Sequence, residues 1–103
     1  MKTVDVLMVR IYITESSNLL YKIIDVLKND VKVRGLSVFR AISGFGESGD
    51  HDSSLVDLSL NLPLSIEFFD DKTRIEKALR GIELMLKPEH IVIWEAKTYT
   101  NQE

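Results

Sequence analysis

The stretch VDVLMVRIYI, residues 4–13, decides the fold because its side chains alternate between two kinds. In a strand, successive side chains point to opposite faces, so residues two apart share a face. One face is wholly apolar: Leu7, Val9, Ile11 and Ile13. The other face is mixed: Met8, Arg10 and Tyr12. This pattern predicts a strand with one face in the core and the other turned away from it.

A helix is expected next, because the apolar spacing changes from two residues to three and four. Its apolar positions are Leu20, Ile23, Ile24 and Leu27. Ser16, Ser17 or Asn18 could provide the N-cap, and the helix should end between Asn29 and Gly35. A second strand is predicted over residues 36–43, which are rich in Val, Phe and Ile.

Alternation returns after a glycine-rich stretch, and it predicts a long third strand over residues 56–68. Pro63 interrupts this strand, and because proline cannot donate to a ladder, it suggests a bulge or an unpaired edge. Asp70 and Asp71 are placed to cap and favour the start of a second helix. The apolar stripe of that helix is Ile75, Leu79, Ile82 and Leu86, and Pro88 should stop it.

Gly81 falls inside the second helix, where glycine costs about 1 kcal/mol relative to alanine, so it marks either close backbone packing or a weak spot in the helix. A last strand is predicted over residues 90–96, and residues 99–103 are expected to form a loose tail. The resulting order is β-α-β-β-α-β. We therefore predict an α+β, ferredoxin-like sandwich, in which two helices cover one face of a four-stranded antiparallel sheet.

The uncovered face of this sheet should carry Met8, Arg10, Tyr12 and Glu67. Arg40 and either Trp94 or Glu95 could join them, depending on the register. Such a mixture of aromatic and charged side chains favours burial against another copy, with opposite charges meeting in the interface. A partly solvated antiparallel face is the alternative.

Composition narrows the classes of function. The chain has 103 residues, of which 45% are hydrophobic and 28% are charged, and this fits a single domain over residues 1–103. It contains no cysteine, which excludes disulfides and thiolate sites and fits a cytoplasmic location. The net charge of −3 argues against nucleic-acid binding. No apolar stretch approaches the roughly 20 residues that span a bilayer, so we expect a protein that is not inserted in a membrane.

The connection between the second and third strands is long and polar, where two residues would close a hairpin. The segment GFGESGDHDSS, residues 44–54, offers backbone freedom, exposed amides, hydroxyls and carboxylates. A connection of this length is typical of a binding loop or a disordered insertion, and we favour the binding loop.

Several segments together resemble the PII signalling proteins, and most closely the PII-like branch of that superfamily. GLSVFRAISGFGESGDH, residues 35–51, is similar to the second strand and the entrance of the T-loop, and LPLSIEFFDD, residues 62–71, is similar to the loop exit and third strand. VRIYITES, residues 9–16, followed by Leu20 and Tyr21, extends the resemblance over nearly the whole chain. The resemblance implies a homotrimer, with ligand clefts between subunits near the base of the loop.

Two features depart from the signalling members of that superfamily. The loop from Glu47 to Leu55 has no tyrosine, so tyrosine modification is not expected. The glycine-rich turn that holds nucleotide phosphates in those members is missing before the last strand. Residues 86–103 offer Lys87, His90 and Lys97 in its place.

These observations lead to a hypothesis of a non-enzymatic, PII-like regulatory homotrimer. It binds a small anionic ligand, with nucleotides among the candidates, and signals through residues 47–55 to a partner protein such as a membrane transporter. The candidate ligand-binding residues are Arg40, Gly44, Phe45, Gly46, Glu47, Ser48, Gly49 and His51. The candidate trimer interface is Met8, Arg10, Tyr12 and Glu67. The sequence does not identify a cofactor.

The alternative hypothesis is a metal-binding trimer similar to the CutA proteins. It would use His51, which lies between Asp50 and Asp52, because imidazole and carboxylate groups suit zinc or manganese. Catalysis by the serines has no support, since the chain has only two histidines and no nucleophile elbow.

Overall fold

The structure is a computed structural model, and it describes residues 1–42 and 63–101. The main elements follow one another in the predicted β-α-β-β-α-β order. They are β1 (Lys2–Thr14), α1 (Leu20–Asp25), β2 (Leu36–Arg40), β3 (Pro63–Asp70), α2 (Lys72–Ile82) and β4 (Ile91–Thr100). A π-helical stretch, η2 (Val26–Val31), continues α1, and three short 3₁₀ helices are η1 (Glu15–Ser17), η3 (Glu83–Met85) and η4 (Pro88–His90).

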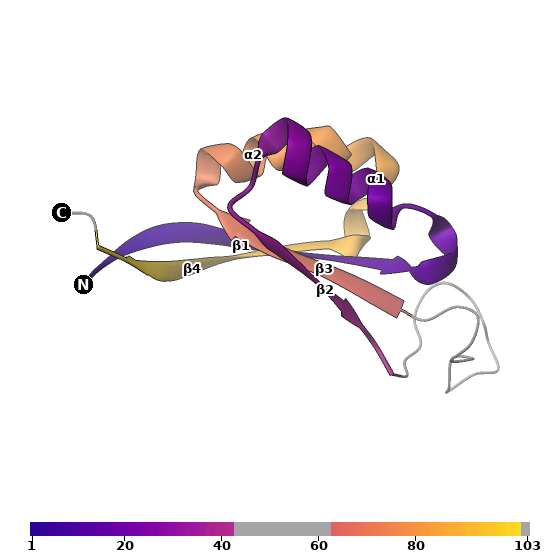
Figure 1. The fold of residues 1–103 in the computed structure, drawn as a ribbon, viewed down its shortest axis with the longest axis horizontal. Coiled ribbons are helices and arrows are strands. Elements are labelled where there is room, and N and C mark those ends of the chain that lie inside the picture. Colours follow the sequence, from indigo (N-terminus) through magenta and orange to yellow (C-terminus); the bar gives the residue numbers. More distant parts are fainter. Residues whose placement is uncertain (43–62, 102–103) are drawn as a thin grey trace.

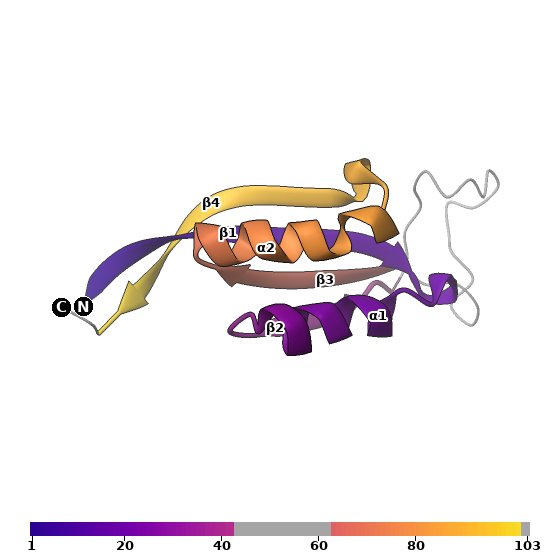
Figure 2. The ribbon, with the colours of Figure 1, turned by 90° about the horizontal axis from the view of Figure 1, so that it is seen from above.

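The four strands form one antiparallel sheet in the order β2-β3-β1-β4. Both helices lie on the same face of this sheet, with α1 over β2 and α2 over the central strands (Figures 1 and 2). The predicted ferredoxin-like α+β fold is therefore confirmed. No helix in the two described ranges has the length and apolar character needed to cross a membrane.

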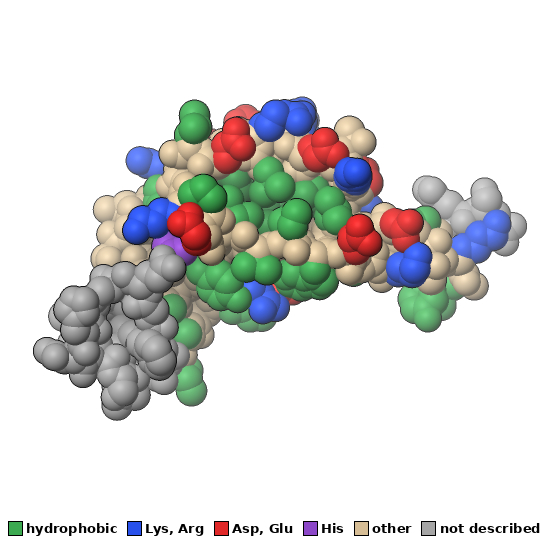
Figure 3. Space-filling view, turned by 180° about the vertical axis from the view of Figure 1, so that it is seen from behind, with side chains coloured by type: hydrophobic (Ala, Val, Ile, Leu, Met, Phe, Trp, Pro, Cys, Tyr) green, Lys and Arg blue, Asp and Glu red, His purple; other side chains and the backbone are tan. Residues whose placement is uncertain are grey.

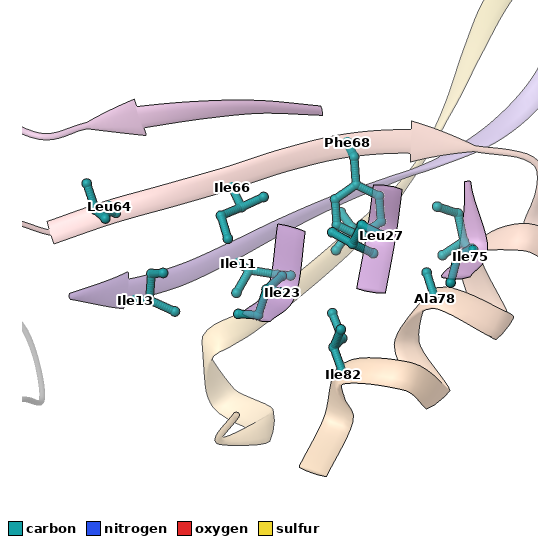
Figure 4. Close-up of a cluster of buried hydrophobic side chains, with 12 residues drawn as sticks. Ile11, Ile13, Ile23, Leu27, Leu64, Ile66, Phe68, Ile75, Ala78 and Ile82 are labelled. Carbon is teal, nitrogen blue, oxygen red and sulfur yellow. The ribbon is translucent and has the colours of Figure 1, made fainter. Parts of the chain in front are cut away.

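The core lies between the sheet and the helices (Figure 4). Ile11 and Ile66 from the two central strands are fully buried, and they meet Ile23 and Leu27 from the first helical segment and Ile82 from α2. Alternation of the strands and the three-to-four spacing of the helices both direct apolar side chains into this layer. The sequence patterns therefore identified the core correctly.

The ends of several elements differ from the sequence-based predictions. No side chain caps α1: Leu19 occupies its N-cap, and Asn18 takes the left-handed conformation with φ 61°. β2 ends at Arg40, short of Ser43, and the predicted strand over residues 56–62 lies outside the described residues. Pro63 is the first residue of β3, a position that tolerates a missing N–H, and it pairs in register with Thr14, so it does not mark an unpaired edge. The predicted bulge would also involve residue 62, which lies outside the described residues.

The second helix and the last strand also have different limits. Asp71 is the N-cap of α2 and accepts a hydrogen bond from the Arg74 N–H at 2.8 Å, as predicted. The helix ends at Ile82, well before Pro88, which instead begins η4. β4 runs to Thr100 because residues 96–100 pair with the start of β1, so the predicted loose tail is wrong for Tyr99 and Thr100. This two-stranded ribbon carries the two chain ends away from the helices (Figure 1).

Gly81 allows the two helical segments to approach closely, as its position suggested. A Cβ built on Gly81 would lie 2.9 Å from Cγ1 of Val26, the first residue of η2. Carbon atoms at that separation overlap, so a larger residue at position 81 would displace Val26.

Candidate functional site

The face of the sheet opposite the helices carries Met8, Arg10, Tyr12 and Glu67, as predicted. Arg10 pairs in register with Glu67 of β3 and with Val92 of β4, and Met8 pairs with Phe69 and Trp94. These side chains share one face because residues paired across an antiparallel ladder project to the same side. We call this surface the open face, and it also includes Phe39 of β2, which pairs with Ser65.

Large apolar side chains on the open face are half-exposed. The exposed fractions are 53% for Phe39, 44% for Tyr12, 43% for Val92 and 37% for Trp94. Figure 3 shows hydrophobic side chains gathered along the underside of the sheet, away from the helices, with a basic side chain among them. Contiguous apolar surface of this kind marks an interaction site more often than ordinary solvated surface.

An ion pair lies in the middle of the open face. Arg10 donates from Nε and Nη2 to the same oxygen of Glu67, Oε2, at 2.9 and 2.6 Å. The Arg10 guanidinium also stacks on Trp94, 5.3 Å from the ring centroid. Hydrogen bonding to Tyr12 and then to Glu67 raises the pKa of Arg10, so the group stays charged at every accessible pH. Four open-face residues thus form a preorganised cluster whose charges are already matched.

Arg40 does not join the open face, which corrects one of the sequence-based expectations. It pairs in register with Leu64, a buried residue of the helix-covered face, so its side chain leaves the sheet on the helix side. There Arg40 Nη2 forms an ion pair with Glu15 Oε1. Trp94 lies on the open face, whereas Glu95 pairs with Leu7 on the opposite side.

Arg40 and Glu15 line a cleft of about 350 Å³ on the helix side of the β2 edge, and we call it the Arg40 cleft. The remaining lining residues are Asn18, Leu20, Tyr21, Val38 and Leu64. The apolar part of this lining comes from β2, β3 and α1, and the polar part from Arg40, Glu15 and Asn18. A volume of this size suits a small molecule.

The start of β2 is anchored by Asp70, a buried residue whose role the sequence did not reveal. Its carboxylate accepts hydrogen bonds from the backbone N–H groups of Arg34 at 3.0 Å and Asp71 at 2.8 Å, and the Arg34 side chain lies 3.4 Å away. Burial alone would raise the pKa of Asp70, but the N–H groups of Asp71 and Arg34 and the charges of Arg34 and Arg74 outweigh it and lower the pKa. This anchor fixes the edge strand that carries Arg40.

The other predicted ligand-binding residues lie outside the described residues: Gly44, Phe45, Gly46, Glu47, Ser48, Gly49 and His51. The structure therefore tests neither the binding loop nor the metal hypothesis that depends on His51. Within residues 1–42 and 63–101, no cluster of three or more His, Asp or Glu side chains could hold a metal ion.

Glu15, Asn18 and Tyr21 were missed as candidate site residues. They follow β1 in sequence, and only the antiparallel order of the sheet brings them to the end of β2. The available signal was the position of Glu15 directly after the predicted first strand. In a β-α-β unit that position lies at the same edge of the sheet as the end of the second strand, where Arg40 stands.

Comparisons with solved structures agree with this architecture. CPII from Thiomonas intermedia K12, bound to ADP and bicarbonate, matches with a TM-score of 0.66 at 15% identity, covering 98% of this chain and 93% of that chain. The apo form of CPII, a nitrogen regulatory PII-like protein, matches with a TM-score of 0.61 at 14% identity, covering 94% and 92%. A putative PII-like signaling protein from Thermus thermophilus also gives 0.61, at 15% identity and coverage of 97% and 93%.

The sequence itself matches a family model over residues 6–98, nearly its full length. That family is DUF190, described as "Uncharacterized ACR, COG1993". The matched range reaches from β1 to β4 and leaves out only the first residues of β1, before Val6, and the last two of β4, Tyr99 and Thr100. The chain therefore belongs to the DUF190 family, and its fold is similar to that of the PII-like proteins named above.

Proposed function

We propose that the protein is a non-enzymatic regulator that assembles as a homotrimer and binds a small anionic ligand at clefts between subunits, near the end of β2 and the start of β3. Arg40 contributes to that site, together with residues 44–49 and His51. The ligand state is reported through residues 47–55 to a partner protein, with a membrane transporter as one candidate by analogy with PII proteins.

The observation that carries the ligand-binding part is the place of Arg40. This guanidinium lines a cleft of about 350 Å³, and it lies only three residues before the segment that contains the candidate binding loop. A planar group with several donors is well suited to carboxylate, bicarbonate or phosphate oxygens. CPII, which shares this fold, has been solved with ADP and bicarbonate, so these two anions are the first ligands to test.

The open face supports the assembly. Its aromatic side chains are half-exposed, and its Arg10–Glu67 pair is matched internally, so that burial against other copies would leave no charge without its partner. Three copies arranged around an axis, with their open faces inward, would remove this surface from water. The same residues, Met8, Arg10, Tyr12 and Glu67, were predicted as interface residues from the sequence.

Calorimetric titration with ADP and with bicarbonate tests the ligand site, and light scattering of the same samples tests the assembly. We expect about three times the mass of the chain for the wild type, and Arg40→Gln should weaken anion binding by about tenfold or more. The matched control is Arg80→Gln, which removes an exposed guanidinium from α2. It should leave both affinity and mass unchanged.

Tyr12→Asp provides the opposite control, because it should dissociate or unfold the trimer by burying a carboxylate without a partner. A wild-type protein with the mass of one chain would refute the trimer. Equal anion affinities for Arg40→Gln and the wild type would remove Arg40 from the ligand site.

A further inference from the structure

The Arg40 cleft contains both a cation and an anion, and this combination narrows the class of ligand. The Arg40 side chain is 60% exposed and that of Glu15 is 33% exposed, and both line the cleft that their ion pair borders. A lone anion that takes the guanidinium leaves the Glu15 carboxylate without its partner and beside a second negative charge. A ligand that brings one charge of each sign keeps both side chains compensated.

The rest of the lining suits an apolar group next to those charges. Leu20, Val38 and Leu64 form an apolar wall, and the exposed ring of Tyr21 stands at the same cleft. Leu64 is buried in the core, which holds this wall in place. Asn18 adds an amide that can donate or accept a hydrogen bond.

From this arrangement we infer that the Arg40 cleft binds an apolar α-amino acid. The guanidinium of Arg40 receives the carboxylate, Glu15 receives the ammonium group, and the wall of Leu20, Val38 and Leu64 receives the side chain. This inference rests on the proposed function, because it assigns the ligand of the same site, and it restricts the anion to a carboxylate that carries an ammonium group beside it.

We prefer an apolar amino acid over a simple anion because of the contacts that are lost and gained when the ligand enters the Arg40–Glu15 ion pair. Insertion of the ligand breaks one contact between Arg40 and Glu15 and forms two charge-assisted contacts, one on each side chain. The pair is partly exposed to solvent, with 60% of the Arg40 side chain and 33% of the Glu15 side chain accessible, so its contribution to folding is modest and it is separated at moderate cost. The apolar wall then adds burial of the ligand side chain.

The test uses leucine and two analogues that each lack one charge. L-Leucine, 4-methylpentanoate and 3-methylbutylamine are titrated into the wild type, Arg40→Gln and Glu15→Gln, with calorimetry for affinity and methyl NMR shifts at Leu64 and Val38 for location. We expect leucine to bind at these methyls, and loss of any one of the four charged groups to weaken binding by about tenfold or more. Because the carboxylate, the ammonium group and the side chain of the ligand each have their own contact, the cleft should distinguish enantiomers, and D-leucine should bind with a different affinity.

The Glu15→Gln variant separates this inference from a simple anion site. If Glu15 receives an ammonium group, its loss weakens leucine binding, but if Glu15 only competes for Arg40, its loss tightens the binding of leucine as well as that of 4-methylpentanoate. Unchanged or tighter binding of leucine to Glu15→Gln, or equal affinities of the wild type for leucine and 4-methylpentanoate, overturns the inference. So does the absence of any shift at Leu64 and Val38 with leucine at millimolar concentration.

Matched controls come from α2, where Arg80→Gln and Glu76→Gln remove exposed charges of the same kinds. Both should bind leucine like the wild type. ADP and bicarbonate in the same panel keep the two proposals apart. A trimer that binds either anion through Arg40 but ignores leucine retains the proposed function and loses this inference, whereas leucine binding by a single chain retains the inference and refutes the trimer.

Discussion

The two faces of the sheet are built from the same strands, yet the apolar side chains on them differ in how far they are exposed to solvent. On the helix-covered face, Ile11, Ile66 and Phe68 are at most 2% exposed, and α1, η2 and α2 pack over them. On the open face, Phe39, Tyr12 and Trp94 remain between 37% and 53% exposed. The helices of residues 1–42 and 63–101 therefore cover one face of the sheet and leave the other uncovered.

The difference extends to charge. The helix-covered face holds a buried carboxylate, Asp70, at the edge of the core, where backbone N–H groups satisfy it. The open face places a complete ion pair at its centre and stacks it on an aromatic ring. A face of this composition is compatible with water and equally with another protein surface, which is the physical basis for proposing that copies of the chain assemble through it.

The largest effect on the free energy of unfolding should come from replacing one phenylalanine on each face by alanine. Phe68→Ala removes a side chain from the core and should lower the free energy of unfolding by about 3–5 kcal/mol. Phe39→Ala removes a half-exposed ring and should cost little in dilute solution, but more as the protein concentration rises and copies cover the open face. Urea denaturation over a range of protein concentrations measures both costs.

The dependence on protein concentration separates a side chain that packs within one chain from one that packs between copies. The assigned roles are supported if the loss of unfolding free energy does not depend on protein concentration for Phe68→Ala but does so for Phe39→Ala. Equal and concentration-independent costs would contradict it, because the open face would then behave like core within a single chain.

A smaller effect should come from Asp70, the carboxylate of the covered face. Its pKa is lowered in the folded protein, so it stabilises the fold above the unfolded-state value of 3.8, and this contribution is lost as pH falls through the lower folded-state value. Asp70→Asn should therefore cost about 1–3 kcal/mol at neutral pH, and the difference from the wild type should shrink in strong acid.

The measurement is the free energy of unfolding in urea as a function of pH for both proteins. Asp30→Asn, at an exposed position of η2, is the control and should follow the wild type. If the difference in unfolding free energy between Asp70→Asn and the wild type stays constant down to strong acid, the charge of Asp70 does not stabilise the fold.

The sequence was sufficient to predict features that depend on local periodicity. Alternation in β1 separated Ile11 from Arg10 and Tyr12 correctly, and the stripe of α2 placed Ile75 and Ile82 in the core. The order of elements then led to the fold, because few arrangements cover one face of a four-stranded sheet with two helices. Each of these inferences needed only residues close together in the chain.

Features that depend on distant pairing could not be predicted in the same way. The face occupied by Arg40 is set by its register with Leu64, and a strand of five residues carries too little alternation to define that register alone. Glu15 meets Arg40 across 25 positions, and the extension of β4 to Thr100 depends on the first residues of β1. The candidate site was therefore predicted in part, with its cation identified and its other walls missed.

The smallest predicted effect concerns the packing between the two helical segments that cover the sheet. Gly81→Ala gains about 1 kcal/mol of helix propensity, but its Cβ would lie 2.9 Å from Val26 Cγ1, and overpacking of that kind typically costs about 1–3 kcal/mol. We expect a small net destabilisation in the wild type. In a Val26→Ala background the obstructing methyl group is gone, so the same substitution should become stabilising by up to about 1 kcal/mol. A double-mutant cycle in urea measures this coupling, and additive effects of the two substitutions would show that the close approach of the helices does not limit the residue at position 81.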